Sequence, residues 1–314
     1  MAILLNNDGH WHDQWRTAIE KHMPGREVVE YPSTSDPKDI EYALVWKHPA
    51  GDLEKYPNLK AVFSLGSGVD YLDAFITLPD APIFRLIDIN MADDMALYTL
   101  YWVIHFQRLF GTYAAQQKRT EWTRYPTPLA PEYKVSILGL GAIGSHIAKA
   151  LAKNGFDVSG WSRSPKTLVG VDCVHGEDGL NSILPETDVL VCCLPFTKAT
   201  YKSLDLAVLS KMKKGGAFIN ISRGAVVNEA DLLTLLDSGH IGGAALDVFH
   251  AEPLPKNSPF WSHSDVHVTP HMSGATNPDT AVQIIAKEVT DFENGIMPPY
   301  PYMREATCAP EVKA

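Results

Sequence analysis

The stretch from Tyr133 to Ala152, YKVSILGLGAIGSHIAKALA, decides the fold that we expect for this chain. An apolar strand leads into a glycine-rich turn, and an amphipathic helix follows the turn. Gly139 allows a tight turn, Gly141 lets main chain approach a pyrophosphate, and Gly144 lets the helix pack closely on the sheet. The first N–H groups of the helix remain available to an anion. Because a strand precedes and a helix follows the glycines, the stretch predicts dinucleotide binding rather than a purely structural turn.

Size and charge narrow the class of protein. The 314 residues are about twice the usual domain size, which predicts two domains. A formal net charge of −10 argues against a nucleic-acid partner, because phosphate binding relies on a basic face. No apolar run approaches the roughly 20 residues that span a bilayer, and the first residues lack a signal peptide's basic region. We expect a cytoplasmic protein with no membrane partner, whose four cysteines are reduced.

Strands that alternate with helices predict an α/β fold with two mostly parallel sheets. The expected strands of the first half are Ala2–Asn6, Glu27–Tyr31, Tyr42–Trp46, Lys60–Leu65 and Ile83–Ile87. After the strand that precedes Gly139, the expected strands are Phe156–Trp161, Asp188–Leu194, Ala217–Ile221, Gly243–Val248 and Val266–Thr269, with helices at Asp205–Lys214 and Asn228–Ser238. The second half therefore has the six strands of a complete dinucleotide-binding domain.

A long helix is expected from Met91 to Gln117, with apolar residues around much of its circumference. Such a helix must be buried on more than one side, either between two domains or against another subunit. A helix from about Asn277 to Asn294 and a proline-rich tail follow the last strand. We expect both to return to the first domain.

The segment Gly160–Lys166 indicates which nucleotide binds. In NAD-binding domains of this type, a carboxylate near the end of the second strand accepts hydrogen bonds from the ribose. Here that place is taken by Ser162, Arg163, Ser164 and Lys166. A 2′-phosphate requires cations, and arginine binds it in two-point fashion. The segment therefore favours NADP(H), with NAD(H) as the weaker alternative.

Three segments each supply one residue for hydride-transfer chemistry. Arg223 follows one strand, Glu252 follows the next and His271 follows the third. An arginine can bind a 2-oxo carboxylate, a histidine can protonate the ketone oxygen, and a glutamate can keep that histidine charged. His263, His267 and His271 recur at four-residue spacing, but Pro270 and the β-branched residues exclude the helix that a metal site of this spacing needs, so no metal is expected.

The segment Ser64–Asp70 is a glycine-rich turn between an expected strand and a helix. Its N–H groups could bind a small anion such as a carboxylate. From the residues alone, a plain loop is the favoured interpretation.

Several motifs, in order, resemble those of the D-isomer-specific 2-hydroxyacid dehydrogenases over nearly the whole chain. They are Gly139–Gly144, Asp188–Pro195 with Thr197 and Thr200, Lys214–Gly224, Asp247–Leu254 and Pro270–His271. The short connector and the segment Leu44–Pro49 look most like the bacterial glyoxylate/hydroxypyruvate reductase A group. Two features depart from the family pattern: the ribose-binding acid is absent, and Asp93 replaces a glutamate that many members have.

The resemblance implies two doubly wound parallel-sheet domains. A Rossmann dinucleotide-binding domain would cover residues 91–284, and a smaller flavodoxin-like substrate domain would combine residues 1–90 with 285–314. It also implies a homodimer joined through the helix at 91–117. Arg223, Glu252 and His271 would form the catalytic triad, and main chain at Ser67, Gly68 and Val69 would hold the substrate carboxylate.

Further contacts are implied for the two ligands. Trp46 would close over the substrate, although a core tryptophan is nearly as good an interpretation. Asp247 would contact the nicotinamide amide. The full set of residues expected to bind the cofactor is Gly139, Gly141, Ala142, Ile143, Gly144, Ser162, Arg163, Ser164, Lys166, Leu194, Pro195, Thr200, Ile221, Ser222, Arg223, Asp247, His271, Ser273 and Gly274.

The leading hypothesis is therefore the NADPH-dependent reduction of small 2-oxo acids, glyoxylate to glycolate and hydroxypyruvate to D-glycerate, with His271 as the proton donor. A reductase of a bulkier 2-oxo acid such as phenylpyruvate is one alternative. A nucleotide-sensing, corepressor-like binding protein is another, because a fold does not fix a function. The complete Arg, Glu and His set favours an enzyme.

Overall fold

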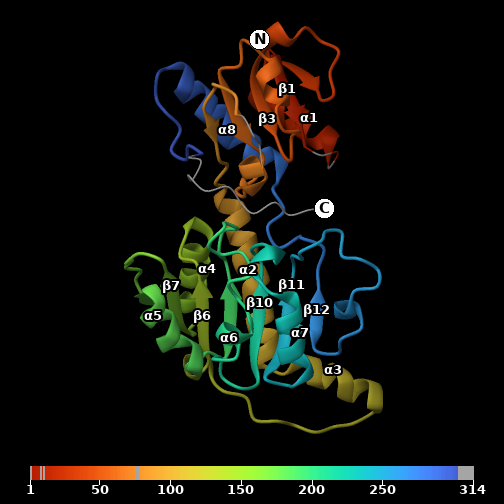
Figure 1. The fold of residues 1–314 in the computed structure, drawn as a ribbon, viewed down its shortest axis with the longest axis vertical. Helices are drawn as coiled ribbons and strands as arrows, with labels where there is room; N and C mark the ends of the chain where they lie inside the picture. Colours follow the sequence, from red (N-terminus) through yellow and green to blue (C-terminus); the bar gives the residue numbers. More distant parts are fainter. Residues whose placement is uncertain (1, 8, 10, 75–77, 303–314) are drawn as a thin grey trace. The chain divides into compact units, whose positions relative to one another are not determined.

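The computed structural model describes residues 2–7, 9, 11–74 and 78–302 (Figure 1). The chain divides into two compact units, Met1–Met91 with Thr276–Ala314, and Ala92–Ala275. The sequence-based boundary for the return to the first domain, residue 285, lies inside a helix, α8 (Pro278–Glu293). In the structure the whole of α8 belongs to the first unit, where it packs against α1 (His12–His22).

The first unit contains a five-stranded parallel sheet in the order β2-β1-β3-β4-β5, which is the flavodoxin-like order. Its strands are β1 (Ala2–Asn6), β2 (Glu27–Glu30), β3 (Ile40–Val45), β4 (Ala61–Ser64) and β5 (Ile83–Phe84). All five were expected, with ends that differ by up to three residues. One face of the sheet packs against α1 and α8, and the other is covered by short 3₁₀ segments that include Leu53 and Leu72.

The second unit contains a seven-stranded parallel sheet in the order β12-β11-β10-β9-β6-β7-β8. Its strands are β6 (Lys134–Leu138), β7 (Asp157–Ser162), β8 (Asp172–His175), β9 (Val189–Cys192), β10 (Gly216–Asn220), β11 (Ile241–Leu246) and β12 (Val266–Val268). Numbered from β6, this is the Rossmann order with one added edge strand. The predicted fold class is confirmed in both units. β8 was not predicted, because this short edge strand is partly exposed and lacks an apolar run.

Helices cover both faces of the second sheet (Figure 1). They are α2 (Ile89–Gln107), which begins before the unit boundary, α4 (Ala142–Lys153), α5 (Gly176–Ile183), α6 (Leu206–Leu209) and α7 (Glu229–Asp237). Alternate residues of β9 enter opposite cores: Val189 and Val191 lie on the α2 and α4 side, and Leu190 and Cys192 lie on the other. A strand buried on both faces explains the continuous apolar run from 189 to 194.

The prediction of one helix from Met91 to Gln117 is wrong. Two helices occupy this region, α2 and α3 (Phe110–Arg119), and Leu109 between them adopts a left-handed conformation with φ of 55°. Such a backbone cannot continue a right-handed helix. The apolar pattern runs through the break, so periodicity gave no sign of it.

Glu288 on α8 is a buried acid whose Oε2 has no hydrogen-bond partner. Burial raises its pKa to about 7 from an ordinary value of 4.5. Between these values the folded chain holds a proton that the unfolded chain releases, so stability falls as the pH rises through this window.

Glu288→Gln carries no charge, and we expect it to be more stable than the wild type at pH 8 by about 1–3 kcal/mol. Urea unfolding at pH 5 and pH 8 measures this, with the exposed Glu20→Gln on α1 as a control. An equal pH dependence in all three proteins would contradict the prediction.

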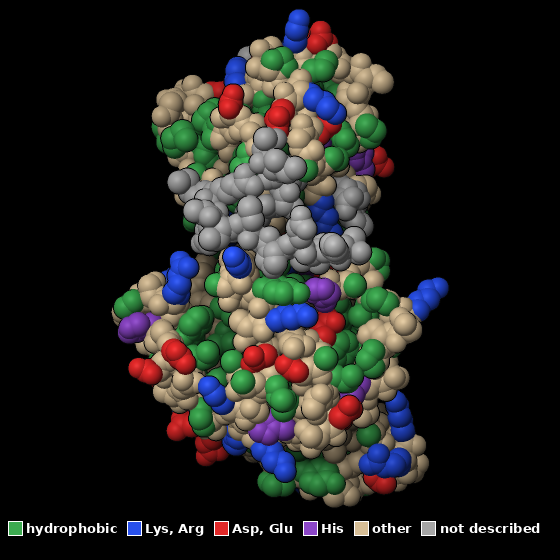
Figure 2. Space-filling view, in the orientation of Figure 1, with side chains coloured by type: hydrophobic (Ala, Val, Ile, Leu, Met, Phe, Trp, Pro, Cys, Tyr) green, Lys and Arg blue, Asp and Glu red, His purple; other side chains and the backbone are tan. Residues whose placement is uncertain are grey.

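No helix among the described residues is both long and apolar enough to cross a bilayer. On the face seen in Figure 2, acidic and basic side chains of the described residues are interspersed rather than gathered by sign.

Candidate active site

The glycine turn after β6 has the geometry that its sequence predicts. Gly139 has a φ of 102°, and a Cβ there would lie 2.7 Å from the carbonyl oxygen of Cys193. A Cβ on Gly144 would lie 1.9 Å from the carbonyl oxygen of Gly139. Gly141 is the N-cap of α4, and a Cβ there would have no heavy atom within 4 Å. The turn is therefore closed on the sheet side and open where the helix begins, at the switch point between β6 and β9, where such folds bind ligands.

His271 and Glu252 form a pair at the carboxyl ends of neighbouring strands. His271 Nδ1 lies 2.8 Å from Glu252 Oε2, while Glu252 Oε1 accepts a 3.0 Å bond from the Phe249 N–H. The Nε2 atom of His271 has no hydrogen-bond partner among the described residues, and its side chain is 41% exposed. A carboxylate on Nδ1 stabilises the imidazolium and leaves Nε2 able to transfer a proton.

The main chain of His271 lies in the left-handed region, with φ of 51°. Non-glycine residues are uncommon there and often mark functional sites. The conformation is held by hydrogen bonds to Asp247, because the His271 N–H donates to the Asp247 carbonyl oxygen at 2.8 Å.

Asp247 is completely buried and organises the turn that carries His271. Its carboxylate accepts hydrogen bonds from Thr269 Oγ1 at 2.6 Å, the Met272 N–H at 2.8 Å and the Ser273 N–H at 2.9 Å. Three donors satisfy a buried carboxylate well. Its observed role is thus to position His271, and its expected contact with the nicotinamide stays a prediction.

Arg223 follows β10, the strand beside β11, and is half-buried. Its Nη1 donates a 2.8 Å hydrogen bond to the Ser222 carbonyl oxygen. The next residue, Gly224, touches the segment before Glu252: a Cβ there would lie 1.9 Å from the carbonyl carbon of Phe249. Only glycine fits this contact, which brings the segments of Arg223 and Glu252 together.

A profile described as "D-isomer specific 2-hydroxyacid dehydrogenase, NAD binding domain" matches residues 100–273. The chain belongs to the D-isomer specific 2-hydroxyacid dehydrogenase family. This confirms the resemblance seen in the sequence. A glyoxylate/hydroxypyruvate reductase A of Citrobacter koseri is 40% identical over 288 residues, which are 90% of this chain and 91% of the relative.

Two solved structures of the family are similar to this one. A D-isomer specific 2-hydroxyacid dehydrogenase from Xanthobacter autotrophicus, in complex with NADPH and MES, has a TM-score of 0.92 and 38% identity, covering 96% of this chain and 98% of its own. An NADPH-dependent glyoxylate/hydroxypyruvate reductase from Sinorhizobium meliloti, in complex with NADP and sulfate, has a TM-score of 0.91 and 33% identity, with the same coverage.

In this dehydrogenase, the residues after β7 present cations and hydroxyl groups. Ser162 ends the strand, and its Oγ donates a 2.8 Å bond to the Ser164 carbonyl oxygen. Lys166 Nζ donates to the carbonyl oxygen of Leu140, inside the glycine turn. Arg163 is exposed, and its guanidinium has no hydrogen bond or ion pair among the described residues. Lys166 thus places a cation at the glycine turn before α4, and Arg163 is a second, exposed cation in the same segment.

The remaining residues of the predicted cofactor set lie at the start of α4, at the carboxyl ends of β9 and β10 and in the His271 turn. Thr200 Oγ1 donates to the Pro195 carbonyl oxygen at 2.6 Å and so fixes the turn after Leu194. Ser222 donates to Asn220 Oδ1 at 2.9 Å. Ile221 and Ser273 are buried, while Ala142, Ile143 and Gly274 are at least partly exposed.

In the first unit, the turn after β4 presents three main-chain donors. The N–H groups of Ser67, Gly68 and Val69 have no acceptor among the described residues. The carbonyl oxygens of Gly66 and Val69 are turned toward protein donors, Ser64 Oγ at 3.0 Å and the Leu72 N–H at 2.9 Å. Consecutive main-chain N–H groups in a turn can bind an anion, and the binding of the substrate carboxylate here stays a prediction.

Trp46 packs over this same turn. A Cβ on Gly66 would lie 2.6 Å from Trp46 Cζ3, and the indole makes an edge contact with Tyr71 at 5.5 Å between ring centroids. The half-buried indole therefore lies beside Gly66, the residue before the three donors, and it also packs against the core of the first unit.

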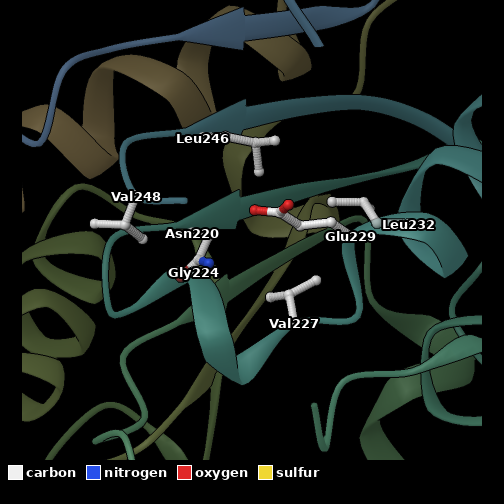
Figure 3. Close-up of a pocket in the computed structure, with 7 residues that line it drawn as sticks. All are labelled: Asn220, Gly224, Val227, Glu229, Leu232, Leu246 and Val248. Atoms are coloured by element: carbon white, nitrogen blue, oxygen red, sulfur yellow. The ribbon is translucent and has the colours of Figure 1, made fainter. Parts of the chain in front are cut away.

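A small cavity lies behind the Arg223 segment, lined by Asn220, Gly224, Val227, Glu229, Leu232, Leu246 and Val248 (Figure 3). It has room for about one water molecule, which is too small for a substrate. Glu229 points into it, and its Oε1 accepts a 2.7 Å bond from the His250 N–H. Glu229, which lines the cavity, thus supports the loop before Glu252.

Sequence reasoning missed Tyr98, which extends the hydrogen-bond network of Asp247. The Tyr98 hydroxyl lies 2.7 Å from Thr269 Oγ1, which in turn donates to Asp247. Burial raises the pKa of Tyr98 to about 12, so the hydroxyl keeps its proton at neutral pH. Among the described residues, no group of three or more His, Cys, Asp or Glu side chains is arranged to hold a metal ion.

Proposed function

We propose that this protein is an NADPH-dependent reductase of small 2-oxo acids, with glyoxylate and hydroxypyruvate as substrates. The observation that carries the proposal is the pair of His271 and Glu252, which leaves one imidazole nitrogen free beside a dinucleotide-binding sheet. The 40% identity to a glyoxylate/hydroxypyruvate reductase A, and the NADPH and NADP complexes of similar structures, support the substrate and the cofactor.

Each step has a residue suited to it. The N–H groups of Ser67, Gly68 and Val69 bind the substrate carboxylate, and Arg223 binds and polarises the 2-oxo acid. NADPH, when bound, would supply the hydride that reduces the C2 carbon. His271 Nε2 gives its proton to the developing alkoxide, and Glu252 stabilises the imidazolium before that transfer. One hydride and one proton convert the ketone or aldehyde to the alcohol.

A substrate and cofactor panel tests the proposal. Glyoxylate, hydroxypyruvate and phenylpyruvate are each assayed with NADPH and with NADH. We expect the highest kcat/KM for glyoxylate or hydroxypyruvate with NADPH, because Trp46 limits the space beside the carboxylate donors. A preference for phenylpyruvate would indicate a reductase of bulkier acids. Nucleotide binding without turnover of any 2-oxo acid would indicate a corepressor-like binding protein.

We further propose that the protein is a cytoplasmic homodimer joined through α2 and α3. Exposed apolar side chains support this: Leu97 is 64% exposed, Tyr101 and Phe110 are also exposed, and Trp122 in the following segment is 95% exposed. Exposed apolar side chains on consecutive elements are the kind of surface that an interface between two copies would cover.

Replacement of Leu97 and Tyr101 by glutamate should therefore give a monomer, because two charges cannot be buried unpaired in an apolar contact. Light scattering after gel filtration measures the mass. Leu206→Glu, at an exposed apolar position on α6, is the control and should keep the wild-type mass. A monomeric wild-type protein would contradict the proposed dimer.

A further inference from the structure

Arg85 is a half-buried cation beside the anion-binding turn of the first unit. It follows β5, the strand that pairs with β4, and its N–H donates to the Tyr300 carbonyl oxygen at 2.9 Å. Its guanidinium makes no ion pair among the described residues. A partly buried charge without a counter-ion is costly, so another role must account for it.

The guanidinium holds one carbonyl group of the turn. Arg85 Nε and Nη2 lie 3.1 and 3.0 Å from the Ser67 carbonyl oxygen, so two donors converge on a single acceptor. In a trans peptide, the carbonyl and the N–H point in opposite directions. Fixing the Ser67 carbonyl toward Arg85 therefore directs the Gly68 N–H away from Arg85.

We propose that Arg85 is a positioning residue for substrate binding, which fixes the Gly68 N–H as a donor to the carboxylate of the 2-oxo acid. The proposal rests on the proposed function of the site. A charge-assisted bond to the carbonyl also polarises the peptide and strengthens the N–H as a donor. The positive charge favours any anion in the turn, while Nη1 has no hydrogen bond among the described residues.

This role has a specific kinetic consequence. The carboxylate is common to all 2-oxo acids and is present in the ground state as well as the transition state. Loss of its binding should raise KM with little change in kcat. The same factor should apply to glyoxylate and to phenylpyruvate, so substrate preference should not change.

The test compares Arg85→Met, Arg85→Lys and a control, Arg16→Met, which removes an arginine of the same unit that pairs with Glu30. We expect Arg85→Met to raise KM for glyoxylate on the order of tenfold, with kcat within about threefold and unchanged NADPH binding by fluorescence. Arg85→Lys keeps the charge but lacks the two-donor fork, and its KM should be intermediate. Arg16→Met should keep the wild-type KM.

A binding measurement separates this proposal from the reaction itself. Oxamate, an unreactive carboxylate, is titrated calorimetrically into each protein with NADPH present. If the wild type turns over no 2-oxo acid but binds oxamate about tenfold more tightly than Arg85→Met does, the role of Arg85 stands and the proposed reaction fails. Equal KM and equal oxamate affinity in Arg85→Met and Arg16→Met would overturn the role of Arg85. A lower melting temperature with unchanged KM would do so too, since it would indicate a purely structural arginine.

Discussion

Replacement of His271 by glutamine is expected to lower kcat for 2-oxo acid reduction by about 10²- to 10⁴-fold, with nearly unchanged binding of NADPH. Glutamine approximates the size of histidine and can still form a hydrogen bond to Glu252, so the turn held by Asp247 should persist. It cannot supply an acidic proton from the place of Nε2. The loss should therefore appear in the chemical step, measured by single-turnover oxidation of NADPH.

Replacement of Glu252, the residue paired with His271, gives a second prediction that can be tested separately. Glu252→Gln removes the carboxylate that holds His271 Nδ1 and stabilises the imidazolium. Because reduction needs the protonated ring, kcat should fall in the variant, by a smaller factor than in His271→Gln, with nearly unchanged binding of NADPH. His250→Gln, an exposed histidine of the same loop, is the control. Near wild-type turnover in His271→Gln would remove the proton donor from the proposed mechanism.

The features of the fold that sequence predicts well are those set by local main-chain geometry. The glycines at 139 and 144 are required by a φ of 102° and by a 1.9 Å approach, and no other residue meets either condition. The expected strands likewise recur, and several of them, such as β1, β3 and β9, carry an apolar run that is buried almost throughout. The break at Leu109 and the strand β8 have no such local signature, and they emerge only from tertiary packing.

The pairing of Glu252 with His271 was predictable for a different reason. The two residues follow β11 and β12, which are adjacent and parallel, so their carboxyl ends lie at one edge of the sheet. The role of Asp247 was less accessible, since a buried carboxylate with three donors looks the same in sequence as an exposed one. The role of Arg85 was harder still to predict. Its contact with Ser67 depends on β4 and β5 lying side by side. A single arginine after a two-residue strand also belongs to no sequence pattern.

Replacement of both Arg163 and Lys166 by alanine is expected to reduce kcat/KM with NADPH by about 10²-fold, while kcat/KM with NADH changes by less than about threefold. The two nucleotides differ only in the 2′-phosphate. An exposed guanidinium without a partner in the described structure, and an ammonium at the glycine turn, are the cations available to that group. Each charge-assisted bond contributes roughly 1.5–3 kcal/mol, so the loss of two accounts for the factor.

Ionic strength distinguishes this contact from a general loosening of the turn. Salt screens exposed charges, so KM for NADPH should rise with salt in the wild type and much less in the double variant, while KM for NADH should respond weakly in both. Lys149→Ala removes an exposed charge from α4 and should retain the wild-type preference. A double variant that lost NADPH and NADH activity in equal proportion would show that these cations support the glycine turn rather than recognise the 2′-phosphate. The absence of a carboxylate at the end of β7 would then need another explanation. Ser162 cannot recognise the 2′-phosphate by itself, because its neutral hydroxyl is already bound to the Ser164 carbonyl oxygen.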